Sequence, residues 1–180
     1  LSSTAVDLDP AAQIFVGVGW DVRTTTGSDF DLDASALVLN AGARVLSDAH
    51  FVFYNNLSTP DGSVVHFGDN LSGEGGGDDE VFVVTLDRLP HEVHSIVFCL
   101  SIYDAEARGQ SFSQVQNLYI RLFSEDGAEI AVAHLDQRGD ESSMILASLE
   151  RHGAAWRFSP QAKAESSLIE IVRRFGVNLD

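Results

Sequence analysis

The chain of 180 residues carries 11 Lys and Arg against 27 Asp and Glu, a net charge of −16, with 44% apolar residues. This length and apolar fraction are typical of a single globular domain with its own core, spanning residues 1–180. The acidic excess argues against nucleic-acid phosphates and anionic lipid as direct partners, and favours cations or basic protein surfaces.

The chain begins with a polar segment over residues 1–13, which we expect to lead into a strand over 14–20. Gly17 and Gly19 fall on one face of that strand, which predicts the close approach of another backbone. A polar loop follows before the next strand.

The segment 30–36 alternates strictly between apolar and polar residues. A period of two places Asp31 and Asp33 on the same face of a strand, about 7 Å apart. One interpretation is a half-exposed strand whose polar face is solvated. The other is that this face meets a second acidic segment and shares metal with it.

The most acidic stretch is GDNLSGEGGGDDE at residues 68–80, with five carboxylates between Asp69 and Glu80. Because no Lys or Arg lies between Arg44 and Arg88, the stretch has no local cation. Two carboxylates about 5 Å apart repel by roughly 3 kcal/mol at an effective dielectric of about 20. Carboxylate, amide, hydroxyl and carbonyl oxygens are the donors that calcium prefers. The pattern is typical of either a calcium-binding loop or a solvated acidic hairpin.

Two known loop patterns do not fit this stretch. A phosphate-binding loop requires a Lys followed by Ser or Thr, and the charge here has the wrong sign. In an EF-hand reading, Leu71, Gly73 and Glu74 depart from the pattern at the third, fifth and sixth positions. A calcium site in this loop would therefore have a geometry of its own.

The remaining chain predicts short strands that alternate with turns. Near the C-terminus, apolar residues recur at helical spacing and Gly176 follows as a stop signal. We therefore expect a mostly β fold, an antiparallel β-sandwich with a C-terminal α-helix packed on it. The predicted strands cover 43–55, as one strand or a pair, and then 63–67, 81–86, 95–103, 117–123, 129–135, 142–151 and 155–158. A short helical turn is predicted over 104–110. The apolar stripe of the C-terminal helix consists of Leu168, Ile171, Val172 and Phe175.

The single cysteine, Cys99, lies in the apolar run 96–100, which predicts a buried and unreactive thiol. One cysteine allows no internal disulfide and fits a reducing compartment. His91 and His94 are too isolated in sequence to indicate a zinc site. Neither a nucleophile elbow nor a metalloprotease helix motif occurs, so no sequence pattern indicates an enzyme. The sequence contains no apolar run that would span a membrane.

Five motifs in this sequence together resemble the tellurium-resistance TerD-type family. They are the Val-Gly-Trp-Asp segment at 18–21, FDLDASA at 30–36, FYNN at 53–56, the acidic stretch at 68–80 and YDAEARGQSF at 103–112. The resemblance extends from about residue 14 to the C-terminus. The acidic stretch together with the Asp-Leu-Asp segment is its most specific part.

The resemblance implies a cytoplasmic β-sandwich that binds calcium, with two neighbouring ions, through its two acidic segments. It also implies a role in bacterial tellurite and general stress resistance without enzymatic activity. The residues that match the implied metal site are Asp31, Asp33, Asp69, Asn70, Ser72, Glu74, Asp78, Asp79 and Glu80.

The first functional hypothesis is a non-enzymatic calcium-binding module that associates with other proteins of a stress-resistance complex near the membrane. It involves neither nucleic acid nor membrane insertion. The alternative is a calcium-dependent enzyme acting on an anionic substrate, with His66 as the nearest base. Direct tellurite chemistry is disfavoured because it requires an accessible thiol and Cys99 is expected to be buried.

Overall fold

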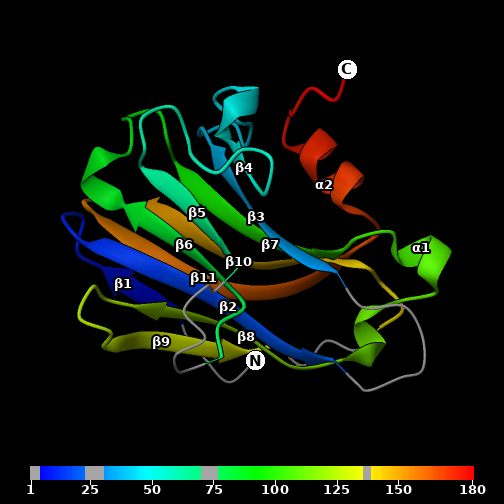
Figure 1. Cartoon of the computed structure of the whole chain (residues 1–180). Coiled ribbons are helices and arrows are strands. Elements are labelled where there is room, and N and C mark those ends of the chain that lie inside the picture. The colour runs from blue at the N-terminus through cyan, green and yellow to red at the C-terminus, as the bar shows by residue number, and fades with distance from the viewer. Residues whose placement is uncertain (1–4, 23–30, 70–76, 136–138) are drawn as a thin grey trace.

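Two antiparallel sheets pack face to face as a sandwich (Figure 1). The computed structural model describes residues 5–22, 31–69, 77–135 and 139–180. The six-stranded sheet has the order β1-β11-β10-β7-β3-β4, and the five-stranded sheet has the order β5-β6-β2-β8-β9. The predicted β-sandwich is confirmed.

The elements follow one another in short succession, as the spacing of turn signals predicts. The strands are β1 Val6–Leu8, β2 Gln13–Val22, β3 Leu32–Leu39, β4 Phe51–Val52, β5 Val64–Asp69, β6 Glu80–Thr85, β7 Ser95–Ile102, β8 Val115–Phe123, β9 Glu129–His134, β10 Ser143–His152 and β11 Ala155–Glu165. The helices are α1 Ala105–Arg108 and α2 Leu168–Arg174, with single 3-10 turns η1 Asp48–His50, η2 Leu86–Arg88 and η3 Phe112–Gln114. None of the helices in these described ranges is long and apolar enough to cross a membrane.

Alternation along the strands builds the core between the sheets. In β2, Ile14 and Val16 are fully buried between the layers, whereas the intervening Phe15 faces outward and stacks on Phe123 of β8. Phe82 of the five-stranded sheet meets Phe98 of the six-stranded sheet edge to face, with ring centroids 5.4 Å apart. Each such side chain contributes about 1.5–3 kcal/mol by leaving water.

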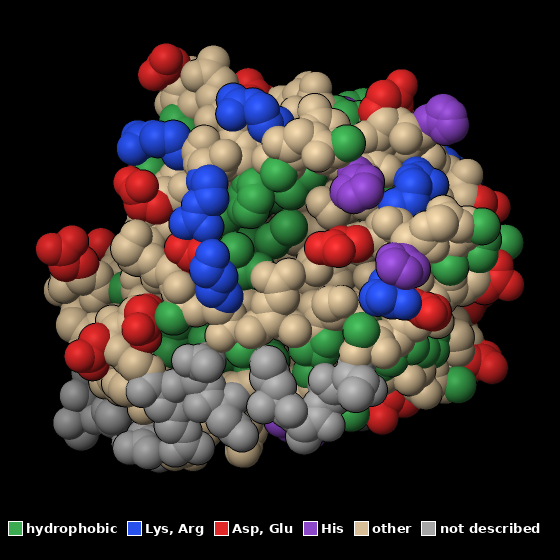
Figure 2. Space-filling model, turned by 180° about the vertical axis from the view of Figure 1, so that it is seen from behind, with side chains coloured by type: hydrophobic (Ala, Val, Ile, Leu, Met, Phe, Trp, Pro, Cys, Tyr) green, Lys and Arg blue, Asp and Glu red, His purple; other side chains and the backbone are tan. Residues whose placement is uncertain are grey.

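Helix α2 covers part of the outer face of the six-stranded sheet, as its apolar stripe predicts. The Ser167 hydroxyl accepts a hydrogen bond from the Glu170 N–H at 3.1 Å and so caps the helix. Ile171 packs with Leu37 and Cys99 in a second cluster outside the sandwich core. Seen from this side, hydrophobic side chains gather in a hollow that Lys and Arg side chains border on one flank (Figure 2).

Burial along the polar face of 30–36 is graded. Asp31, just before β3, is exposed and Asp33 is half-buried. Ser35 is 2% exposed, and beyond this segment Leu37 is fully buried where α2 packs. The half-exposed interpretation therefore holds at the start of the segment and fails at its end.

Three predicted boundaries differ from the structure. Residues 1–13 are not only an entry segment, since β1 pairs with β11. Within 43–55 the strand is limited to β4, and η1 precedes it. Strand β11 continues past Pro160 to Glu165, because the ladder with β10 shifts register at this point and tolerates a residue without an N–H.

Packing of α2 over Cys99 generates the first prediction. Burial raises the pKa of the Cys99 thiol to about 12, so a thiol reagent should label it far more slowly in the native protein than in denaturant. Ile171→Ala should lower the free energy of unfolding by about 3 kcal/mol and accelerate labelling through local opening of α2. Ile169→Ala removes a side chain that is 55% exposed and should change neither measurement. Native labelling at the denatured rate would contradict this packing.

Candidate metal centre

The acidic end of the sandwich brings together segments that lie far apart in the sequence. The Trp20 N–H at the end of β2 donates to Asp79 Oδ2 at 2.9 Å, and the Asp79 N–H donates to the Val18 carbonyl. On the other sheet, the Tyr103 N–H donates to the Asp31 carbonyl at 2.7 Å. These backbone contacts fix where the C-terminal part of the acidic stretch and the start of β3 lie.

Glu80 connects the two sheets directly. Its Oε2 atom accepts a hydrogen bond from the Ala34 N–H at 2.6 Å and lies 3.2 Å from His66 Nε2. Glu80 is 5% exposed and His66 is 4% exposed, and the His66 ring packs edge-on against Phe82. A charge-assisted hydrogen bond in such a site contributes about 1.5–3 kcal/mol. Glu80 therefore holds the part of β3 that contains Asp33 beside the start of β6.

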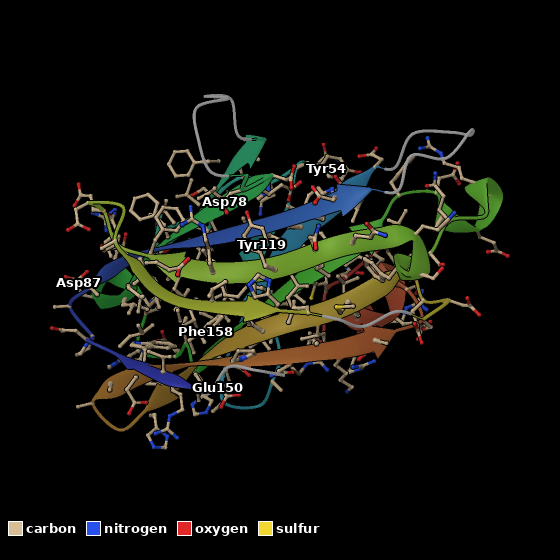
Figure 3. The ribbon with its side chains drawn as sticks, turned by 90° about the horizontal axis from the view of Figure 1, so that it is seen from below. Tyr54, Asp78, Asp87, Tyr119, Glu150 and Phe158 are labelled. Atoms are coloured by element: carbon tan, nitrogen blue, oxygen red, sulfur yellow. The ribbon has the colours of Figure 1, made fainter. Side chains whose placement is uncertain are left out.

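Asp78 is anchored on the outer face of the five-stranded sheet (Figure 3). Arg121 forms a bidentate ion pair with its carboxylate, with Nε–Oδ1 at 2.8 Å and Nη2–Oδ2 at 2.5 Å. The Tyr119 hydroxyl donates to Oδ1 at 2.8 Å. Burial, and then this hydrogen bond to a carboxylate, raise the pKa of Tyr119 above its usual range. Asp78 is 6% exposed, so its charge is balanced locally.

Gly17 and Gly19 make room for this anchor. A Cβ atom at Gly17 would lie 2.6 Å from an Asp78 carboxylate oxygen, and one at Gly19 would collide with the Tyr119 ring. The close approach predicted from the two glycines is confirmed, but the approaching groups are side chains rather than another backbone. Arg121 and Tyr119 had no sequence signal of their own as partners of Asp78.

The predicted metal ligands divide into three groups by their surroundings. Asp78 and Glu80 already have donors from the protein, as described above. Asp31 is exposed just before β3, Asp33 is half-buried on the outer face of β3, and Asp79 is half-buried beside Trp20. The backbone of Asp69 pairs with Glu80 at the end of β5, while Asn70, Ser72 and Glu74 lie outside the described residues.

Within the part of the chain that the structure describes, no three His, Cys, Asp or Glu side chains are placed to hold one metal ion together. His91 and His94 are both exposed beyond β6, and their spacing does not create a ligand cluster there. A metal site at the acidic end would therefore need donors beyond these described side chains.

Comparison with known proteins decides the family. The TerD domain model matches residues 3–175. The chain belongs to the TerD family. It is 44% identical to the tellurium resistance protein TerD of Alcaligenes sp., over 99% of this chain and 93% of the relative. It is 38% identical to general stress protein 16U of Bacillus subtilis (strain 168), over 93% of this chain and 89% of the relative.

The fold of this TerD-family chain also matches a solved structure. The crystal structure of a homologue of the telluride resistance protein TerD from Streptomyces coelicolor A3(2) superimposes with a TM-score of 0.71. The two share 20% sequence identity over 90% of this chain and 95% of that one. The two-sheet architecture is thus retained at low sequence identity.

The buried pair of Asp78 and Arg121 generates the second prediction for this TerD-family chain. Arg121→Gln leaves a buried carboxylate without its cation and should lower the free energy of unfolding in urea by about 3 kcal/mol. Asp78→Asn combined with Arg121→Gln should recover part of that loss, because no unpaired charge remains. Arg173→Gln, in an ion pair of two exposed side chains, should change stability by less than about 0.5 kcal/mol. Equal stability of the Arg121→Gln and Arg173→Gln variants would refute the anchor role of Asp78.

Proposed function

We propose that this chain is a non-enzymatic calcium-binding protein of the tellurite and general stress resistance type, which acts through association with other proteins. One observation carries the proposal: the hydrogen bond from the Ala34 N–H to the Glu80 carboxylate, which joins the two acidic segments at one end of the sandwich. The resistance role is supported by membership of a family whose members include proteins named for tellurium resistance and for general stress.

The donor chemistry at this end fits calcium. The acidic stretch and the start of β3 supply carboxylate, amide and hydroxyl oxygens, which are hard donors. Because Asp78 and Glu80 are engaged by protein donors, we assign them to positioning the C-terminal end of the acidic stretch. Two calcium ions would be held by the remaining predicted ligands, which are Asp31, Asp33, Asp69, Asn70, Ser72, Glu74 and Asp79.

Calcium, when bound, would neutralise the repulsion that otherwise keeps these carboxylates apart. The chain itself fixes the C-terminal end of the acidic stretch. Arg121 holds Asp78 against the five-stranded sheet, and Glu80 is held by Ala34 of the opposite sheet. The Trp20 N–H orients the Asp79 carboxylate. Metal binding would thereby be coupled to folding of this end of the sandwich.

The placement of His66 weighs against the alternative of a calcium-dependent enzyme. A general base must reach the proton that it removes from a substrate. His66 is 4% exposed, lies against Phe82 and contacts Glu80, so a substrate would have to displace core side chains to reach it. The non-enzymatic function is therefore the one we propose.

An apolar outer face supports the proposed association with proteins. Register places Val65, Val83, Phe15 and Phe123 in one row across four strands of the five-stranded sheet. Phe67, further along β5, is 60% exposed. Arg121 lies over the Phe123 ring at 4.3 Å, and its charge is paired with Asp78. Phe15, Val65 and Phe123 are partly exposed, whereas Val83 is 7% exposed, and exposed apolar side chains gathered on one face are typical of protein-binding surfaces.

The proposed setting is the cytoplasm, as part of a membrane-associated stress-resistance complex. The net charge of −16 disfavours nucleic acid and anionic lipid as direct ligands. We therefore propose calcium and other proteins as the partners.

Calcium should stabilise the fold, which is the third prediction. Binding to the native state alone adds about 2.7 kcal/mol to the free energy of unfolding at 100 times Kd. The melting temperature should rise with calcium, rise less with magnesium, and fall in excess chelator. Amide exchange across residues 69–80 should become slower when calcium is added.

Matched variants localise the calcium response. Asp69→Asn should reduce the calcium-dependent rise in melting temperature, whereas Asp126→Asn, in the turn between β8 and β9, should leave it intact. Asp78→Asn should lower stability in chelator as well as in calcium, because Asp78 is assigned to an anchor. An identical melting temperature in calcium and in chelator would refute calcium binding at this end.

The fourth prediction concerns the apolar outer face. A photo-crosslinking residue at position 67 should form crosslinks to another protein in stressed cells, because Phe67 projects from this face. The same residue at position 125, in the exposed turn between β8 and β9, provides the control for non-specific contact. Mass spectrometry of the crosslinked peptides reports the partner. Crosslinks that are absent at position 67, or equal at both positions, would exclude this face as the interface.

A further inference from the structure

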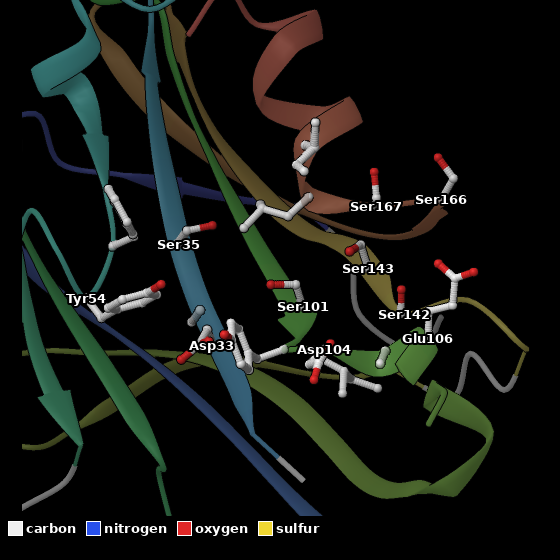
Figure 4. A pocket seen from close by; sticks show the side chains of 17 residues that line it. Asp33, Ser35, Tyr54, Ser101, Asp104, Glu106, Ser142, Ser143, Ser166 and Ser167 are labelled. Carbon is white, nitrogen blue, oxygen red and sulfur yellow. The ribbon is translucent and has the colours of Figure 1, made fainter. Parts of the chain in front are cut away.

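A second candidate site lies on the other sheet, in a cavity of about 420 Å³ beneath the start of α2 (Figure 4). Its floor is a polar row, since register aligns Asp33 of β3 with Ser101 of β7 and Ser143 of β10. Ser35, one step further along the outer face of β3, also lines the cavity. The volume is within the range of about 300–1,000 Å³ typical of small-molecule sites.

The Ser35 hydroxyl is an unexplained polar group at this floor. Ser35 is 2% exposed, and among the described residues its Oγ atom has no hydrogen-bond partner. Figure 4 shows this hydroxyl directed toward the cavity. A buried hydroxyl without a partner is unfavourable, and a ligand atom at the floor would supply the missing hydrogen bond.

The charge of the lining selects for a cation. Carboxylates are contributed by Asp33, Asp104 and Glu106, whereas the residues that line the cavity include no Lys, Arg or His within the described part of the chain. Arg108 lies 3.8 Å from Asp104 and offsets part of this charge from outside the lining. The cavity remains acidic, which disfavours anionic ligands.

Aromatic and aliphatic side chains complete the lining. Tyr54 and Tyr103 are 55% and 54% exposed and present ring surface at the cavity. Ile102, Leu168 and Ile169 add aliphatic surface. Aromatic faces together with carboxylates are the groups that bind ammonium ions. Aliphatic surface favours an attached hydrocarbon over a bare metal ion, which prefers oxygen on all sides.

We propose that this cavity binds a small organic cation, a protonated alkylamine of a few carbon atoms. The ammonium group lies among the carboxylates and tyrosine rings. The ammonium group also donates a hydrogen bond to the Ser35 hydroxyl, and the alkyl chain runs along the aliphatic surface of Leu168 and Ile169. Asp33 belongs both to this site and to the proposed calcium ligands, and the other residues of the two sets differ.

Three probes of equal length test the charge preference. Hexylammonium, 1-hexanol and hexanoate carry charges of +1, 0 and −1 on the same chain. Each is titrated into the ¹⁵N-labelled protein in calcium and again in chelator, and amide shifts report affinity and location. Hexylammonium should bind about tenfold more tightly than 1-hexanol, hexanoate should not bind, and the shifts should map to β3, β7 and the start of α2. Shifts confined to 77–80, or equal affinity for hexylammonium and 1-hexanol, would overturn the proposal.

Variants then test the assigned groups. Asp104→Asn with Glu106→Gln removes two exposed carboxylates and should weaken hexylammonium binding about tenfold. Asn is suitable at position 104, where φ is 54°. Ser35→Val should also weaken binding, by loss of the hydroxyl. The control, Asp87→Asn with Glu125→Gln, removes two exposed carboxylates outside the cavity lining and should leave binding unchanged. Equal binding by the test and control pairs would overturn the site.

Discussion

The Glu80 carboxylate fixes the acidic end of this molecule. Contacts between the sheets are otherwise mostly apolar and carry little directional preference. A buried carboxylate requires specific donors, and Glu80 finds one in the Ala34 N–H of the opposite sheet and lies against His66 of its own. This arrangement sets which part of β3 lies beside the acidic stretch. The position of Asp31 and Asp33 relative to Asp79 follows from it.

The distribution of basic residues explains how a chain of net charge −16 buries acidic groups. Among the described residues, the buried carboxylates are Asp78, Glu80 and Glu165. Each has a basic side chain beside it, which is Arg121, His66 and Arg174 respectively. The hydrogen bonds from Arg174 hold the pKa of Glu165 below its usual range. Pairing with a basic side chain thus offsets the cost of burying these three carboxylates.

The two sheets use their outer faces differently. On the six-stranded sheet, α2 covers Leu37 and Cys99 and leaves a serine-lined cavity at its own start. On the five-stranded sheet, glycines in β2 admit the Asp78 anchor, and an apolar row remains beside it. The proposed calcium and organic-cation sites share Asp33, and the proposed protein-binding face lies on the five-stranded sheet. Strand alternation creates all three, because every strand must present a second face.

The sequence by itself determined the strand-rich fold, the C-terminal helix, the burial of Cys99 and the family. The fold, the helix and the burial of Cys99 follow from local periodicity, which reports which side of an element is apolar. The family follows from contiguous motifs. The tertiary structure alone decided which groups contact Asp78 and Glu80. Their partners Tyr119 and Ala34 lie 41 and 46 residues away. Periodicity does not specify which strand lies opposite, so it could not predict these contacts. For the same reason the cavity at Ser35, which strands β3, β7 and β10 and helices α1 and α2 all help to line, has no counterpart in the linear sequence.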